Sequence, residues 1–148
     1  MSLTENTPDP GLVPELLVED LDASLDFWCR LGGFDVLYDR PEQRFAYIGR
    51  GTAHLMLEQT GAGRNWTPAA LQPPLGRGVN FQISVPSIEP IVSALRAVDW
   101  PLFMEPEQKW YRTGATDAGV AQFLVQDPDG YLIRFQASLG RRAVTPGE

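Results

Sequence analysis

The feature that most constrains the fold of this chain is an internal repeat. An apolar, strand-like segment at 13–18 precedes Leu21, and a similar segment at 80–85 precedes Ile88. Val18 and Val85 are 67 positions apart, and so are Leu21 and Ile88, so a strand and the helix after it recur in one register. Two similar modules in one small chain favour a ligand site between them.

Length, composition and charge limit the classes of protein to consider. The chain has 148 residues, of which 43% are hydrophobic and 21% charged, as expected for one globular domain. Its formal net charge of −7 argues against nucleic acid or an anionic membrane as partner, because both attract a basic surface. A cationic ligand is compatible with this charge, although acidic surfaces also serve solubility alone.

Cysteine content and apolar runs bear on the cellular compartment. Cys29 is the only cysteine, so no internal disulfide can form, and its place beside Trp28 on a helix predicts a buried, inert thiol. No apolar run has the length of a signal sequence or a membrane span. We therefore expect a cytoplasmic protein.

In the first module, residues 13–18 form the expected first strand. Acidic Asp20 and Asp22 favour a helix start, the apolar spacing from Leu21 to Leu31 predicts one buried helix face, and Gly32 ends the helix. Three further strands are expected at 34–38, 45–48 and 54–57, separated by turn residues.

The second module repeats this order after a Gly/Pro-rich loop at 61–77. We expect a strand at 79–85, a helix at 87–98, and strands at 101–104, 121–126 and 131–136, with a possible strand near 109–112. Asp127–Gly130 has the residues of a hairpin turn. The prediction is an α+β fold of two βαβββ modules, at about 12–60 and 78–138.

Three motifs in order resemble one known family. They are Val18-x-Asp20-Leu21-x-x-Ser24-x-x-Phe27-Trp28, Leu31–Phe34 and Asp127–Phe135. Together they resemble the glyoxalase/bleomycin-resistance/extradiol-dioxygenase superfamily, the vicinal oxygen chelate fold. The resemblance covers about residues 12–138 and implies curled, cup-like mixed sheets with the active groove inside.

The resemblance also implies where a divalent metal would be bound in the family's enzymes. The four ligand positions correspond to Val13, Met56, Asn80 and Arg134. None of these is a usual ligand for such an ion, so we expect no metal and no cofactor. A shifted register would substitute Glu58 or His54 for Met56, and Glu15 or Gln82 for the first-strand positions, which leaves open a metal-dependent glyoxalase- or dioxygenase-like enzyme.

His54 is the only histidine and the natural candidate for a general base. Its place next to Leu55 and Met56 leads us to expect that it points away from the cup. No Ser-His-Asp or Cys-His arrangement is recognisable in the sequence.

Aromatic residues are the remaining candidates for function. Phe45 follows Pro41–Arg44 and Trp110 follows the near-copy Pro106–Lys109. Bleomycin-resistance proteins bind a planar, cationic antibiotic in a groove at a dimer interface, and the resemblance implies that Phe45 matches one of their aromatics. The position of their second aromatic corresponds to Gly119 in this sequence. Trp110 takes the place of that aromatic only if residues 111–118 form a looped insertion.

The resulting hypothesis is a metal-free homodimer that binds a small aromatic or cationic molecule without turnover. Trp28 and Trp100 are expected in the core. Arg134 is expected to meet Glu15, Glu58 or the anionic part of a ligand. A structural or regulatory domain with a vestigial groove is a further possibility. The candidate ligand-binding residues are Phe45, Trp66, Asn80, Trp110, Arg112 and Arg134.

Overall fold

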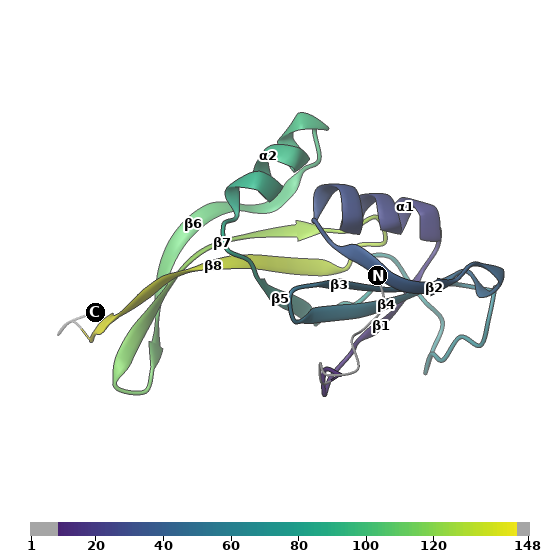
Figure 1. Ribbon diagram of the computed structural model, residues 1–148, viewed down its shortest axis with the longest axis horizontal. Coiled ribbons are helices and arrows are strands. Elements are labelled where there is room, and N and C mark those ends of the chain that lie inside the picture. Colours follow the sequence, from purple (N-terminus) through teal and green to yellow (C-terminus); the bar gives the residue numbers. More distant parts are fainter. Residues whose placement is uncertain (1–8, 145–148) are drawn as a thin grey trace. The chain divides into compact units, whose positions relative to one another are not determined.

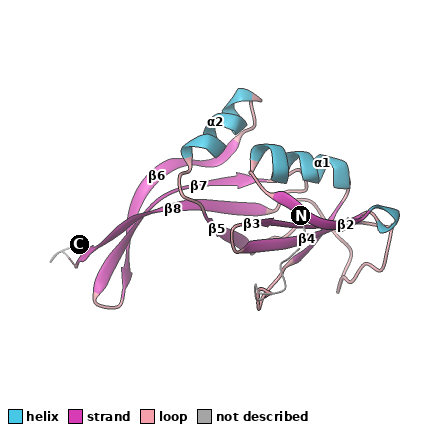
Figure 2. Ribbon diagram, viewed as in Figure 1, coloured by secondary structure: helices cyan, strands magenta, loops and turns pink. Residues whose placement is uncertain are grey.

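The structure is a computed structural model that describes residues 9–144 (Figure 1). The chain forms two compact units. Unit 1 contains the residues up to Leu75 together with Asp127–Gly130, and unit 2 contains Gly76–Gln126 and the residues from Tyr131 on. Each unit holds one four-stranded mixed sheet, so the α+β fold of two similar modules is confirmed (Figure 2).

The sheet of unit 1 has the strand order β1-β4-β3-β2, with β1 parallel to β4 and the other neighbours antiparallel. Its elements in chain order are β1 (Glu15–Val18), α1 (Leu21–Leu25), η1 (Asp26–Leu31), β2 (Asp35–Arg40), η2 (Pro41–Gln43), β3 (Phe45–Arg50) and β4 (Ala53–Gln59).

The sheet of unit 2 has the corresponding order β5-β8-β7-β6, with β5 parallel to β8. The repeated strand order confirms the repeat read from the sequence. Its elements are β5 (Asn80–Ser84), α2 (Glu89–Ala97), β6 (Leu102–Thr113), β7 (Thr116–Gln126) and β8 (Leu132–Ala143).

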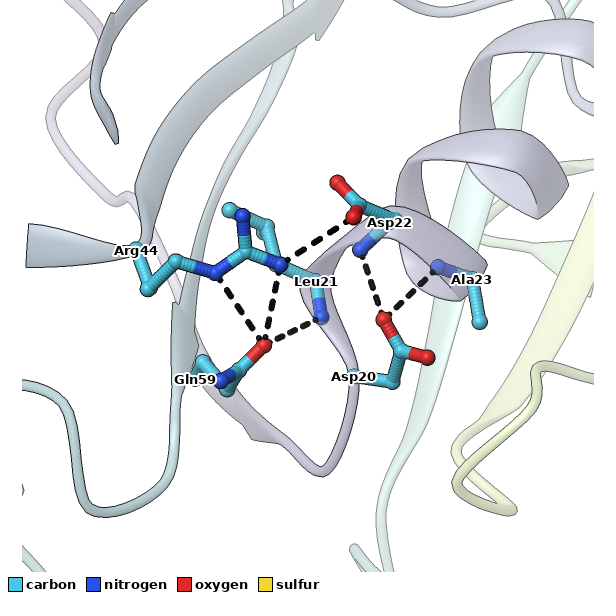
Figure 3. Close-up of polar contacts among 6 residues, drawn as sticks. All are labelled: Asp20, Leu21, Asp22, Ala23, Arg44 and Gln59. Carbon is cyan, nitrogen blue, oxygen red and sulfur yellow. Dashed lines mark hydrogen bonds and ion pairs between the residues drawn. The ribbon is translucent and has the colours of Figure 1, made fainter. Parts of the chain in front are cut away.

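The first helix starts where the sequence predicts. The Asp20 carboxylate accepts hydrogen bonds from the backbone N–H groups of Asp22 and Ala23 at 3.0 and 3.3 Å, which caps the helix (Figure 3). After Leu25 the helix continues as a π-helix. Phe27 and Trp28 in this π-helix are buried, and Leu25 just before it is only half-buried.

Alternating apolar residues form the core of each unit. In unit 1 the fully buried strand residues are Val18, Ala46, Ile48 and Leu57, and in unit 2 they are Phe123, Val125, Ile133 and Phe135. The opposite face of each sheet carries polar side chains, among them Glu58 in unit 1 and Gln122 in unit 2.

The turn Asp127–Gly130 does more than connect β7 and β8. Trp28, fully buried as expected, donates from its indole nitrogen to the Asp127 carboxylate at 3.3 Å. The Asp129 carboxylate accepts from the Glu19 N–H at 2.9 Å and from the Ser24 hydroxyl at 3.4 Å. Burial raises the pKa of Asp129.

One expectation about the second module needs correction. The strands expected at 101–104 and near 109–112 are one strand, β6. Residues 111–118 form the tip of a regular β-hairpin, so the condition under which Trp110 would replace Gly119, a looped insertion, is not met. Pro106–Lys109 therefore lies inside a strand, whereas Pro41–Gln43 is a 3-10 helix, so the similar phrases have different structures. None of the helices in residues 9–144 has the length and hydropathy needed to cross a membrane.

Candidate ligand-binding sites

The polar face of the sheet in unit 1 is organised by strand register. Phe45 lies opposite both Glu58 and Arg40, and in the adjacent row Met56 lies opposite both Glu15 and Tyr47. Residues directly opposite each other share a face of the sheet, so all of these side chains project to the same side.

A cavity of about 500 Å³ opens on this face, and we call it the acidic cavity after its two carboxyl groups, which line it together with two arginines. Its charged and aromatic walls come from β1 to β4 and from the loop after β4. The lining residues are Glu15, Arg40, Gln43, Phe45, Glu58, Ala62, Gly63, Arg64 and Trp66. Two of the predicted ligand-binding residues, Phe45 and Trp66, are thus brought to one site.

Two carboxyl groups meet in the acidic cavity. Burial, followed by the adjacent Glu58 carboxyl group with which Glu15 shares a hydrogen bond, raises the pKa of Glu15, while Arg40 opposes the shift. Glu58 is only 8% exposed and lies against Gly63, where a Cβ atom would collide with its carboxylate. A buried carboxylate next to a second one favours a positively charged partner.

Both aromatic rings of the acidic cavity already carry a cation. The Arg40 guanidinium lies 3.9 Å from the centre of the Phe45 ring and donates to Gln43 Oε1 at 2.8 Å. Arg64 lies 5.3 Å from the centre of the Trp66 ring. Phe45 is 3% exposed, so a ligand ring reaches it only when Arg40 moves, whereas Trp66 is 73% exposed.

His54 does not point away from this face, contrary to expectation. It is two residues from Met56 in β4, and side chains two apart on a strand share a face. Its Nδ1 shares a hydrogen bond of 2.8 Å with the Tyr47 hydroxyl, and Tyr47 stacks on Tyr38 with ring centres 4.7 Å apart. These contacts give His54 a structural role within a polar aromatic cluster.

Unit 2 has a cavity of about 380 Å³ on the corresponding face, and we call it the Arg134 cavity. Strand register places Arg134 opposite Gln82, and Gln136 opposite Gln122. The lining residues are Gln82, Tyr111, Thr113, Ala118, Gly119, Val120, Gln122, Arg134, Gln136, Ser138, Gly140 and Arg141.

Arg134 lacks a partner in unit 2. Its Nε is buried without a hydrogen-bond acceptor, and no carboxylate among the described residues of unit 2 forms an ion pair with it. The proposed partners Glu15 and Glu58 belong to unit 1, so that pairing stays a prediction. Asn80 lies at the start of β5 opposite Leu132 and is not among the cavity-lining residues.

Trp110 and Arg112 are not on the face of the Arg134 cavity. Trp110 lies directly opposite Gly119, whereas its neighbour Tyr111 lies opposite Ala118 and lines the cavity. The Arg142 guanidinium covers the Trp110 ring at 4.1 Å, and Arg112 Nε lies 3.7 Å from the Asp117 carboxylate. The aromatic side chain that lines this cavity is therefore Tyr111, because alternation along β6 places Trp110 on the opposite face. A ligand-binding role for Trp110 stays a prediction.

The side chains at the family's metal positions do not fit a divalent ion. Val13 and Met56 offer no hard donor, and Arg134 projects a positive charge with an unsatisfied buried N–H. Among the described residues, no three His, Cys, Asp or Glu side chains gather into a metal-binding group.

The family model for the Glyoxalase/Bleomycin resistance protein/Dioxygenase superfamily matches residues 12–135. The chain belongs to this superfamily. No curated protein matches the sequence.

Solved structures from several bacteria are similar to this chain. TioX from Micromonospora sp. ML1 is 22% identical, with a TM-score of 0.65 over 86% of this chain and 98% of its own. Virulence protein STM3117 from Salmonella typhimurium is 20% identical, with a TM-score of 0.62 over 91% and 98%. A superfamily member from Vibrio splendidus 12B01 is 36% identical over 84% and 95%, with a TM-score of 0.39.

Proposed function

We propose that this protein binds a small molecule that carries an aromatic ring and a positive charge, and that it does so in the acidic cavity, without a metal and without turnover. The observation that carries the proposal is the gathering of Glu15, Glu58, Phe45 and Trp66 around one cavity. Bleomycin-resistance proteins, which belong to the same superfamily, bind ligands of this chemical class.

The carboxyl pair supplies the charge recognition. Burial and, after it, the neighbouring Glu58 raise the pKa of Glu15, and a ligand ammonium or guanidinium group placed between the two carboxyl groups offsets both effects with two favourable contacts. Since Glu58 is buried, such contacts are screened by salt much less than those on an open surface.

The aromatic rings supply the second half of the recognition. Arg40 on Phe45 and Arg64 on Trp66 show that both rings accept a cation at their faces. A cationic ligand that takes either place gains on the order of 0.5–2 kcal/mol from the ring. Trp66 is the accessible one, so it makes the first contact and reports binding by its fluorescence.

A bleomycin titration followed by tryptophan fluorescence tests the proposal. We expect saturable quenching, its loss in Trp66→Leu, and an affinity at least about tenfold lower in Glu58→Gln. Asp39→Asn removes an exposed carboxylate that does not line the cavity and should bind as the unaltered protein does. No response at high micromolar bleomycin would remove the drug assignment, and failure of a wider panel of cationic aromatic compounds would remove the binding function.

We further propose that the chain acts as a homodimer, as the dimeric grooves of bleomycin-resistance proteins suggest. Sedimentation at micromolar concentration should give twice the mass of one chain. A monomer under these conditions would contradict this part of the proposal.

A further inference from the structure

The polar face of unit 2 carries a chemistry different from that of unit 1 at corresponding strand positions. In unit 1, Met56 on the last strand lies opposite Glu15 on the first. In unit 2, Arg134 on the last strand lies opposite Gln82 on the first. The repeated fold thus presents an arginine and an amide where unit 1 presents a thioether and a carboxylate.

Among the described arginines of unit 2, Arg134 and Arg142 each have a buried Nε without a hydrogen-bond acceptor, but the Arg142 guanidinium covers the Trp110 ring whereas Arg134 lines the cavity. Arg96 lies 2.7 Å from a carboxylate oxygen of Glu105, and Arg141 donates to Thr113 Oγ1 at 2.8 Å. Arg134 lines the cavity with its Nε buried and without an acceptor among the described residues. Buried charged donors are normally hydrogen-bonded, so we expect a ligand in the cavity to accept a hydrogen bond from Arg134.

Two other residues that line the cavity, Tyr111 and Arg141, also offer donors. The Gln122 side-chain amide nitrogen donates to Glu107 Oε1 at 3.0 Å and to the Tyr111 hydroxyl oxygen at 2.7 Å. Since Tyr111 accepts this bond, its own hydroxyl hydrogen remains available to a ligand. Arg141 adds a second positive charge to the lining.

The geometry points to a binding site for a small-molecule oxyanion, a carboxylate or a phosphate ester, in the Arg134 cavity. The guanidinium of Arg134 matches the planar edge of such a group with two parallel N–H donors, and the Tyr111 hydroxyl adds a third. The site goes beyond the proposed function, since it lies in unit 2 and takes a ligand group of opposite charge. It does not require the acidic cavity to bind anything.

The first test uses the unaltered protein, so it does not depend on the folding of any variant. The ¹⁵N–¹H signal of Arg134 Nε is followed during titration with benzoate, phenyl phosphate and benzyl alcohol, three probes that share a ring and differ in charge. We expect a saturable shift with at least one of the two anions and none with benzyl alcohol. The anion that binds more tightly identifies carboxylate or phosphate as the preferred group.

The second test removes the charge. Arg134→Gln should weaken binding of the preferred anion at least about tenfold, the loss expected for a charge-assisted hydrogen bond. Arg96→Gln removes the same charge from an exposed ion pair of α2 and should change the affinity by less than about twofold. Thermal melting of both variants checks that they are folded.

Two results would overturn the inference. One is the absence of any shift of the Arg134 Nε signal with either anion up to about 10 mM, a concentration that detects millimolar dissociation constants. The other is a folded Arg134→Gln variant that binds the anion as tightly as the unaltered protein. Glu58 lines the acidic cavity and not the Arg134 cavity, so loss of bleomycin binding in Glu58→Gln together with retained anion binding separates the two proposals.

Discussion

The indole of Trp110 lies over Gly119 on the neighbouring strand, so close that a Cβ atom at Gly119 would come within 2.7 Å of the ring. The resemblance to bleomycin-resistance proteins implies an aromatic residue at position 119. In this chain a tryptophan from the adjacent strand lies beside that position, with Arg142 stacked on its ring.

Gly119→Ala should destabilise the protein by about 1–3 kcal/mol, because the added methyl group overpacks the site under the indole. The measurement is urea unfolding of the single variant, of Trp110→Val and of the double variant. When Trp110 is already valine, Gly119→Ala should cost much less unfolding free energy, because the indole that the added methyl group would meet is absent. Gly11→Ala, where a Cβ atom meets nothing within 4 Å, is the control, and an equal effect in both glycine variants would contradict the prediction.

Gln59→Met should cost about 1–2 kcal/mol of unfolding free energy, since one oxygen of Gln59 serves three donors (Figure 3). It accepts from the Leu21 N–H at 3.0 Å and from Arg44 Nε and Nη2 at 3.3 and 3.2 Å. Urea unfolding measures the loss. Gln108→Met on the exposed side of β6 should be nearly neutral, and a similar cost at both positions would show that the Gln59 contacts are not the cause.

Glu15→Gln should stabilise the protein at neutral pH by about 0.5 kcal/mol, the order of an exposed charge pair. The folded-state pKa of Glu15 is raised from its ordinary value of 4.5. Ionisation therefore costs stability as the pH rises from 4.5 through the folded-state pKa, and the cost is fully present above it. The gain should vanish below pH 4.5, where the carboxyl group is protonated in both states. If the gain in unfolding free energy does not depend on pH, or if Asp39→Asn gives the same gain, the raised pKa of Glu15 is not its cause.

Arg40→Gln should increase the affinity for a cationic aromatic ligand about two- to fivefold, because the variant uncovers the Phe45 ring and removes a competing positive charge. Fluorescence titration with bleomycin measures the change. Arg30→Gln, which removes a charge paired with Asp26 on the surface of η1, is the control. Weaker binding in Arg40→Gln would mean that Arg40 contacts the ligand instead of competing with it for the Phe45 ring.

The sequence by itself determined the repeated βαβββ order, the Asp20 cap and the burial of Trp28. These features depend on local propensity and on periodic apolar residues, which can be counted along the chain. The family resemblance placed Phe45 among the candidate residues, the polar loop around Trp66 placed that residue there, and the structure brings both to one cavity.

Only the tertiary structure decided which side chains share a face. The expectation that His54 points away from the cup was wrong, because a shift of one residue in strand register reverses every side chain, and register is set by pairing with distant strands. Glu15 meets Glu58 and Trp110 meets Gly119 across strands, and neither contact follows from spacing along the chain. Pairing between strands, rather than local sequence, therefore determines the chemistry of both cavities.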